Sequence, residues 1–279
     1  MPIHDQGYRR YRGTRVPSGR AWWVIARAGV GTMLRRRAFV ALLALAWLPF
    51  VVRAVQIYAA TTLPQASFLA PDANLFRDFL EQQGAFLFFV TVYAGSGLIA
   101  NDRRTNALQI YLSKPMTRLE YVVGKCAVLA SLLLFVTWVP AFMLLLVQIA
   151  FSGSLIFLRD NLFLFPAITL FSWLQAVTVT LMMLALSSLS KSSRFVGILY
   201  AVLMFFSRAL GGIVYAVTRD RRLSWISVPA DLSRIGDAIF GLPSRGEASI
   251  AVALIAIGVL AVGSVYVLQR RVRGVEVVV

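Results

Sequence analysis

Long uninterrupted apolar runs alternate with short charged segments along the whole chain. Because the bilayer core is about 30 Å thick and needs about 20 apolar residues per helical span, runs of this length predict membrane-spanning helices. A membrane β-barrel would instead show short segments of alternating polarity. We therefore predict an all-α membrane protein. The six expected spans lie at about Ala38–Tyr58, Gln83–Ala100, Lys125–Phe151, Leu162–Leu189, Phe195–Val217 and Ala248–Leu268.

The composition agrees with a chain whose solvent is largely lipid. Of its 279 residues, 59% are hydrophobic and 14% are charged, whereas soluble domains are about half apolar and about a quarter charged. The formal net charge of +16 also suggests nucleic-acid binding. Most of the basic residues, however, lie beside the apolar runs on one predicted side, which is the usual signature of membrane topology. We therefore prefer topology to nucleic-acid binding.

The basic flanks also predict how the chain is oriented. The N-terminal tail, the second and fourth connections and the C-terminal tail carry most of the flanking Lys and Arg residues, and such segments are cytoplasmic. Both termini are therefore expected in the cytoplasm. Residues 1–37 form a basic tail with an interfacial helix, 38–268 form the transmembrane domain and 269–279 form a second cytoplasmic tail. The Arg219–Arg222 cluster, in the fifth and outer connection, runs against this pattern.

Two amphipathic segments lie outside the expected spans. In Gly19–Phe39 the apolar positions share one arc of a helical wheel and arginines lie off that arc, which predicts a helix in the membrane interface. A solvated leader to the first span is the alternative. In Asp231–Phe240 apolar residues recur at helical spacing and Gly241 follows as a stop signal. This pattern predicts a short amphipathic helix on the outer face before the last span.

The most informative segment is Asp102–Lys125, a charged stretch between the second and third apolar runs. Asp102–Ser113 can form a short helix, and because Pro115 disfavours helix at the preceding residue, this helix is expected to end there. Thr117 and Glu120 have the spacing of a capping box, which predicts that a new helix begins at Arg118. A defined helix–break–helix is suited to passing force from a cytoplasmic partner into the spans. A plain cytoplasmic loop with good caps explains the same pattern equally well.

The same segment carries a recognisable order of residue types: an acidic residue after the second span, a leucine-rich stretch, a Ser-x-Pro step, an arginine, an aromatic residue and Gly-Lys. The residues that carry this order are Asp102, Leu108, Tyr111, Leu112, Ser113, Pro115, Arg118, Tyr121, Gly124 and Lys125. In these features the chain resembles the ABC-2 type transporter permeases. That family often has glycine where this chain has Asn106. The six-span plan, the interfacial helix and the long fifth connection extend the resemblance over most of the chain.

The resemblance implies a membrane subunit of an ATP-driven transporter, an exporter in the bacterial inner membrane. Two such subunits, as a homodimer or a heterodimer, would form the pathway and each would dock on a separate cytoplasmic ABC ATPase, which binds ATP and Mg. The alternative is a non-transporting scaffold or anchor subunit of a larger complex. The residues expected to couple to the ATPase are Asp102, Arg103, Arg104, Leu108, Tyr111, Leu112, Pro115, Arg118 and Glu120.

Motifs for chemistry within this chain are weak. A phosphate-binding loop needs G-x-x-x-x-G-K-[ST], but Gly124-Lys125 is preceded by Leu119 where the first glycine belongs and is followed by Cys126. ATP hydrolysis is therefore expected in a partner chain. Cys126 and His4 are the single cysteine and histidine, so we expect no catalytic residue, metal site or cofactor here.

Three polar residues within the expected spans are candidates for a transport pathway. Arg208 lies deep in the fifth span, where a charged side chain costs about 2.5–3.5 kcal/mol on insertion scales. It could bind an anionic substrate group or pair with Asp220 or Asp231; a shifted span from which Arg208 snorkels outward is the alternative. Gln148 and Gln175 could face a cavity or make ordinary hydrogen bonds between helices.

Overall fold

The computed structural model describes residues 19–62, 72–107, 116–151, 159, 161–218, 227–243 and 249–272. In this part of the chain all regular structure is helical. The helices are α1 (Ala21–Leu34), α2 (Arg37–Ala46), α3 (Leu48–Thr62), α4 (Ala73–Val90), the π-helix η2 (Thr91–Gly95), α5 (Gly97–Arg104), α7 (Arg118–Val136), α8 (Trp138–Phe151), α10 (Leu164–Leu189), α11 (Ser193–Thr218), α12 (Val228–Ile239) and α13 (Ile250–Arg271).

Six helical segments are long and apolar enough to cross a membrane, which confirms the predicted all-α, six-span plan. They are Arg37–Thr62, Ala73–Arg104, Arg118–Phe151, Leu164–Leu189, Ser193–Thr218 and Ile250–Arg271. The second helix begins at Ala73 rather than at Gln83, where the apolar run begins. Its first turns carry charged residues that are paired within the fold, so the helix continues beyond the apolar run.

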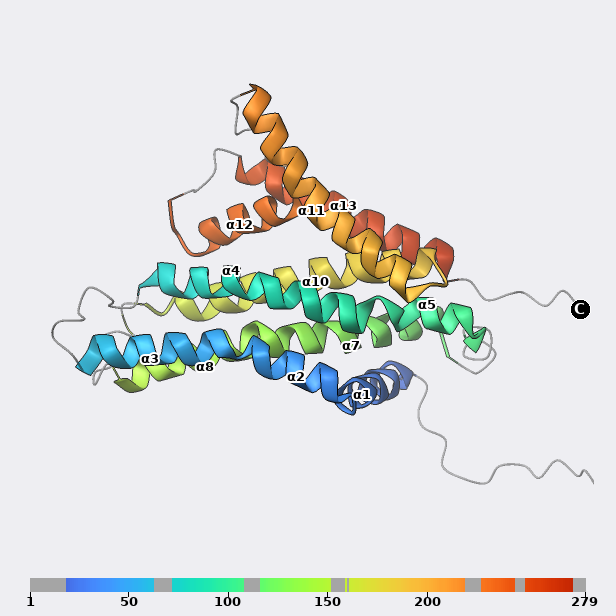
Figure 1. The fold of residues 1–279 in the computed structure, drawn as a ribbon, viewed down its shortest axis with the longest axis horizontal. Coiled ribbons are helices and arrows are strands. Elements are labelled where there is room, and N and C mark those ends of the chain that lie inside the picture. Colours follow the sequence, from blue (N-terminus) through green and yellow to red (C-terminus); the bar gives the residue numbers. More distant parts are fainter. Residues whose placement is uncertain are drawn as a thin grey trace, which may run out of the picture.

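One end of the bundle gathers α1, the end of α5, the start of α7, the end of α10, the start of α11 and the end of α13 (Figure 1). We call it the basic end, because most of its charged residues are Lys or Arg. The described basic residues there are Arg20, Arg27, Arg35, Arg36, Arg37, Arg103, Arg104, Arg118, Lys125, Lys191, Arg194, Arg270 and Arg271, and the acidic residues are Asp102 and Glu120.

Helix α10 lies at the centre of the bundle. In its most apolar window 67% of the residues are buried, against 17% for α11 and for α13. One apolar cluster joins α10 to the basic half of the bundle, and a second joins it to α3, α4 and α8 in the other half. The amphipathic α12 packs against α13, α10, α11 and α4. Gly241, with a φ of +65°, follows α12 and confirms the predicted helix stop.

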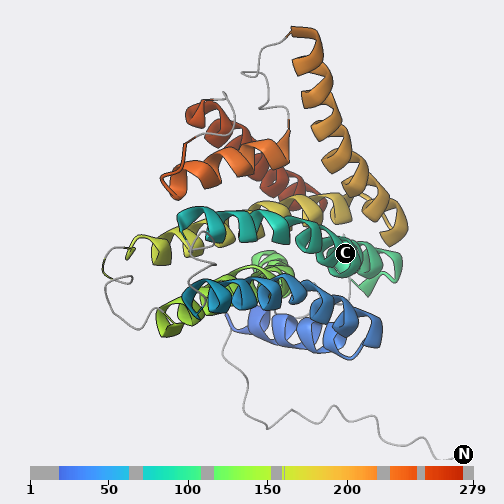
Figure 2. The same cartoon turned by 60° about the vertical axis from the view of Figure 1, so that its left-hand side comes forward.

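Helix α1 lies against α7 at the lower edge of the fold (Figure 2). The contact is close: a Cβ atom built on Gly29 would lie 2.5 Å from Val128, and one built on Gly124 would lie 2.9 Å from Ile25. Only glycine at both positions allows this approach. Part of the apolar arc of α1 therefore packs on protein, with Ala26 buried, and the interfacial placement of this helix stays a prediction.

Spans one and three each contain a break, at Trp47 between α2 and α3 and at Thr137 between α7 and α8. Each break lies just before a proline, Pro49 or Pro140. Proline donates no backbone hydrogen bond and its ring crowds the preceding turn, so the regular ladder of hydrogen bonds is interrupted there.

Candidate functional site

At the basic end, Asp102 joins the last turn of α5 to the first turns of α7. Its Oδ2 accepts a hydrogen bond from the hydroxyl of Tyr121 at 2.7 Å and lies 2.6 Å from Nζ of Lys125. Tyr121 and Lys125 are one helical turn apart, so both reach the same carboxylate. We call these three residues the Asp102 cluster. Because hydrogen bonds to charged groups are stronger than neutral ones, this cluster fixes the end of span two to the start of span three.

A second connection ties span two to α10, directly after the π-helix Thr91–Gly95. The hydroxyl of Ser187 donates to the carbonyl of Ser96 at 2.9 Å and accepts the backbone N–H groups of Ile99 at 3.1 Å and Ala100 at 3.0 Å. A π-turn shifts the helical hydrogen-bond ladder and leaves backbone groups in need of other partners. A side chain of α10 supplies them, so this irregularity is held in place by the neighbouring helix.

The arginines predicted to couple to an ATPase divide into two kinds. Arg103 donates to the backbone carbonyl of Ser188 and so strengthens the link between α5 and α10. Arg104 and Arg118 are exposed. Leu119, which follows Arg118 in the first turn of α7, is 72% exposed although it is a large apolar residue. Leu119 was not among the predicted coupling residues, because an apolar residue next to an apolar run resembles the start of the span.

The predicted start of the second helix at Arg118 is confirmed, whereas the first helix differs: Asp102 belongs to the last turn of α5, which ends at Arg104 rather than continuing toward Ser113. Thr117 and Glu120 form a complete capping box: the Thr117 hydroxyl accepts the Glu120 N–H at 3.2 Å, and the Glu120 carboxylate accepts the Thr117 N–H at 2.9 Å. Asn106 has a φ of +55°, a left-handed conformation that asparagine tolerates better than most residues. The predicted coupling residues Leu108, Tyr111, Leu112 and Pro115 lie outside the described residues.

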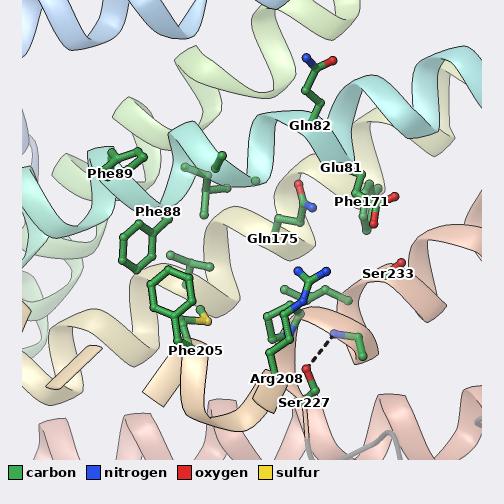
Figure 3. Close-up of a pocket in the computed structure, with 18 of the residues that line it drawn as sticks. Glu81, Gln82, Phe88, Phe89, Phe171, Gln175, Phe205, Arg208, Ser227 and Ser233 are labelled. Carbon is green, nitrogen blue, oxygen red and sulfur yellow. Dashed lines mark hydrogen bonds between the residues drawn. The ribbon is translucent and has the colours of Figure 1, made fainter. Parts of the chain in front are cut away.

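A cavity of about 680 Å³ opens between α4, α10, α11 and α12. Aromatic side chains form much of its wall: Phe88 and Phe89 from α4, Phe171 from α10 and Phe205 from α11 (Figure 3). Polar side chains line another part of the wall, among them Gln82, Gln175, Arg208, Ser227 and Ser233.

Two of the three predicted pathway residues meet in this cavity. Gln175 and Arg208 reach toward it from α10 and α11 (Figure 3). Gln175 is 7% exposed and its Oε1 has no hydrogen-bond partner among the described residues. Arg208 is exposed and makes no ion pair within the described part of the chain, with Asp231 or any other acid. Gln148 is buried on α8 and does not line the cavity.

A buried ionic cluster borders the cavity where α4 meets α12. Arg77 Nε lies 2.7 Å from Asp237 Oδ1, and the two side chains are 0% and 1% exposed. Arg77 also pairs with Glu81 and donates to the carbonyl of Ser233 at 3.3 Å. We call these four residues the Arg77 cluster. No sequence pattern predicted this cluster, because Arg77 and Asp237 were both expected in outer connections, far apart in the chain.

A second acid on α12 is buried and has no basic partner among the described residues. Asp231 is 2% exposed and its Oδ1 has no hydrogen-bond partner among the described residues. Burial disfavours the charged form of a carboxyl group and raises the pKa of Asp231 to about 7. The side chain therefore changes its charge near neutral pH.

The comparisons with known proteins agree with this architecture. The family model described as "ABC-2 family transporter protein" matches residues 23–222. This range contains spans one to five, the Asp102 cluster, and the parts of the cavity wall that come from α4, α10 and α11. Comparison with individual curated proteins finds no match. Because the family match covers most of the chain, the chain belongs to the ABC-2 transporter family and is a multi-pass membrane permease subunit.

Proposed function

We propose that this permease subunit is driven by a separate cytoplasmic ATPase that docks at the basic end. The observation that supports the proposal best is the division of residues at that end. Asp102 and Arg103 are bonded within the chain, whereas Arg104 at the end of α5 and Arg118 and Leu119 at the capped start of α7 are exposed. The bonded residues give the junction stiffness and the exposed ones offer a docking surface.

The charge distribution supports the orientation that this requires. The basic end gathers most of the described Lys and Arg residues that flank the spans, and positively charged flanks stay in the cytoplasm. In a bacterial inner membrane this arrangement has both chain termini and the docking surface on the side where ATP is available. ATP and Mg²⁺ would be bound by the partner ATPase.

The connections inside the bundle offer a route from the docking surface to the cavity. A displacement of the 102–125 segment would pass into α7 through Lys125 and into α10 through the bond between Arg103 and the Ser188 carbonyl. It would also pass along span two, across η2, into α4. Helices α4 and α10 carry the cavity residues Phe88 and Gln175. ATP-driven movement at one end would thereby alter access to the cavity, as alternating access requires.

We further propose that two copies of this permease, or two related permeases, enclose the pathway, and that transport is outward. Support for the pairing comes from α11, which contributes to the cavity wall although only 17% of its most apolar window is buried in this chain. Its apolar surface is available to a second subunit as well as to lipid. Outward transport rests on the family resemblance.

The experiment is purification of the tagged protein from its native membrane, followed by mass spectrometry of the proteins that accompany it. We expect an ATPase with a phosphate-binding loop to co-purify with the wild type and to be lost from Leu119→Asp. An acidic residue in the first turn of a helix is favourable, so this change leaves α7 intact. Leu162→Asp is the matched control, because Leu162 is also exposed and lies at the start of another span, just before α10, at the opposite end.

Two outcomes would contradict the proposal. Intact wild-type protein without any ATPase would favour the scaffold or anchor alternative. Equal loss of ATPase from both variants would mean that the effect is not specific to the basic end.

A further inference from the structure

We propose that the cavity between α4, α10, α11 and α12 binds a single-chain amphiphilic anion, whose acidic group pairs with Arg208 and whose apolar body lies on the aromatic wall. The inference rests on the proposed function only in taking this ligand to be the transported substrate. Binding itself needs no ATPase and can be measured on the permease alone.

The size and lining of the cavity favour a small organic ligand. Its volume of about 680 Å³ lies within the range of about 300–1,000 Å³ that is usual for small-molecule sites, which are mostly apolar with a few placed polar groups. Phe88, Phe89 and Phe205 provide flat apolar surface on the α4 and α11 sides of the cavity (Figure 3). Aromatic rings of this kind contribute large contact areas to a bound apolar chain.

The charges of the cavity wall favour an anion. The positive charge of Arg77 is compensated by Asp237 and Glu81. Arg208, in contrast, makes no ion pair within the described residues, although it belongs to the spanning helix α11. Arginine within a membrane span is stable when it faces a cavity or a counter-charge rather than lipid, and such residues mark substrate pathways. Among the described residues that line the cavity, Arg208 is therefore the cation available to pair with a ligand.

Gln175 provides a second, independent indication of a ligand. Its side chain is 7% exposed, points into the cavity, and carries an Oε1 atom without a hydrogen-bond partner among the described residues (Figure 3). A buried polar group without a partner is unfavourable. An amide offers both donors and an acceptor, so the polar head of a ligand can satisfy Gln175 while its acidic group pairs with Arg208.

The same wall disfavours other ligand classes. A cation would be repelled by Arg208, and the carboxylate of Glu81, which also lines the cavity, is already paired with Arg77. A fully apolar molecule would leave both Arg208 and Gln175 without partners, and desolvating polar groups without replacing their hydrogen bonds selects against such ligands. An amphiphilic anion satisfies the aromatic surface, the amide and the guanidinium together.

The test uses the purified full-length protein in nanodiscs of zwitterionic lipid and a pair of matched fluorescent probes. The acid probe is 11-(dansylamino)undecanoic acid and the neutral probe is its methyl ester. We expect saturable binding of the acid with an affinity at least about tenfold higher than that of the ester, as loss of a hydrogen bond to a charged group implies. Equal binding of the two probes, or no saturable binding of the acid, would overturn the proposal.

Variants locate the binding. Arg208→Gln is expected to remove the preference for the acid, and Arg194→Gln is the matched control, because Arg194 is an exposed arginine on the same helix that does not line the cavity. Gln175→Leu, of similar size, is expected to weaken binding of the acid. Unchanged acid affinity in Arg208→Gln would overturn the proposal.

A third pair of variants tests occupancy of the space independently of charge. Gly84 lines the cavity, and a Cβ atom there would meet no atom within 4 Å. Gly84→Leu is therefore expected to fold normally and to block both probes. Gly258→Leu on α13 is the control, since Gly258 also has open space around a Cβ atom and does not line the cavity. Persistent binding in Gly84→Leu would place the probe elsewhere.

Two further measurements separate this inference from neighbouring ones. The titration is repeated with anionic phospholipid in the nanodisc: unchanged acid affinity supports a single-chain ligand, whereas loss of probe binding would identify bilayer lipid as the occupant and overturn the proposal.

ATPase co-purification is measured on the same variants. Probe binding without an ATPase would leave the cavity site standing and contradict only the proposed function.

Discussion

The basic end and the cavity use polar residues in opposite ways. At the basic end Asp102, Arg103 and Ser187 all have partners on neighbouring helices. In the cavity Arg208 and Gln175 have no such partners among the described residues. Fully bonded polar groups hold helices in one arrangement, whereas unpartnered ones are unfavourable until something binds. The contrast suggests that the basic end transmits movement and the cavity receives a ligand.

The two regions share the helices that connect them. Span two runs from the cavity residues of α4, through η2, to Asp102 on α5, and α10 carries both Gln175 and Ser187. The unpartnered side chains therefore lie on helices whose other ends are fixed. Substitutions can test each region by itself, because the bonded contacts and the cavity contacts involve different residues.

The largest effect on stability is expected from the Arg77 cluster, which lies beside the cavity but is bonded like the basic end. Arg77→Met leaves Asp237 buried without its counter-charge, and breaking a buried pair costs about 3–5 kcal/mol. The double variant Arg77→Met/Asp237→Leu is expected to recover most of that loss. The stability of the single and the double variant is measured by unfolding in detergent. If Arg77→Met is as stable as the wild type, the pair does not hold α12 on α4.

The next largest effect is expected from pH, through Asp231. Its pKa is about 7 in the folded protein, above the ordinary value of 3.8, so the contribution of this group to stability is complete below about pH 4 and is lost as the pH rises through about 7. The loss is about 4 kcal/mol at most. Asp231→Asn should remove this part of the pH dependence of unfolding, whereas Asp72→Asn, at an exposed helix cap, should retain it. A pH profile unchanged in Asp231→Asn would contradict the effect of burial.

A smaller effect is expected at the Asp102 cluster. Asp102→Ala removes the partner of Lys125 and of the Tyr121 hydroxyl, and hydrogen bonds to charged groups contribute about 1.5–3 kcal/mol. A double-mutant cycle with Lys125→Met measures how much of this belongs to the pair. In the assembled transporter we expect Asp102→Ala to lower the transport rate more than it lowers the amount of ATPase that co-purifies with the permease. Additive effects of the two substitutions would argue against a coupled pair.

The smallest effects are expected from alanine substitutions at two glycines, one closely packed and one with open space around it. At Gly124 a methyl group meets Ile25 and the backbone of Trp22, so Gly124→Ala is expected to cost about 1–3 kcal/mol. At Gly84 the methyl group meets nothing, and alanine within a helix is more stable than glycine by about 0.5–1 kcal/mol. The thermal unfolding temperature should therefore fall in Gly124→Ala and rise in Gly84→Ala. A shift in the same direction would indicate that α1 does not pack on α7 as described.

Local sequence rules predicted the features that depend on neighbouring residues. The six spans, the capping box of Thr117 and Glu120, and a helix ending before Gly241 all follow from patterns within one turn or one run. The pairing of Arg77 with Asp237 and the contacts of Ser187 join residues far apart in the chain, and no local pattern specifies them. Arg208 was a candidate because of its charge. That it lines the same cavity as Gln175 depends on how α10 and α11 pack, which no local pattern specifies.

The most direct test of the account is the amount of ATPase that co-purifies with Leu119→Asp and with Arg208→Gln, prepared in parallel with the wild type. If the basic end docks the ATPase and the cavity binds the ligand, Leu119→Asp loses the ATPase and Arg208→Gln retains it in full. Retention by Leu119→Asp, or equal loss from both variants, would contradict the division of roles between the two regions.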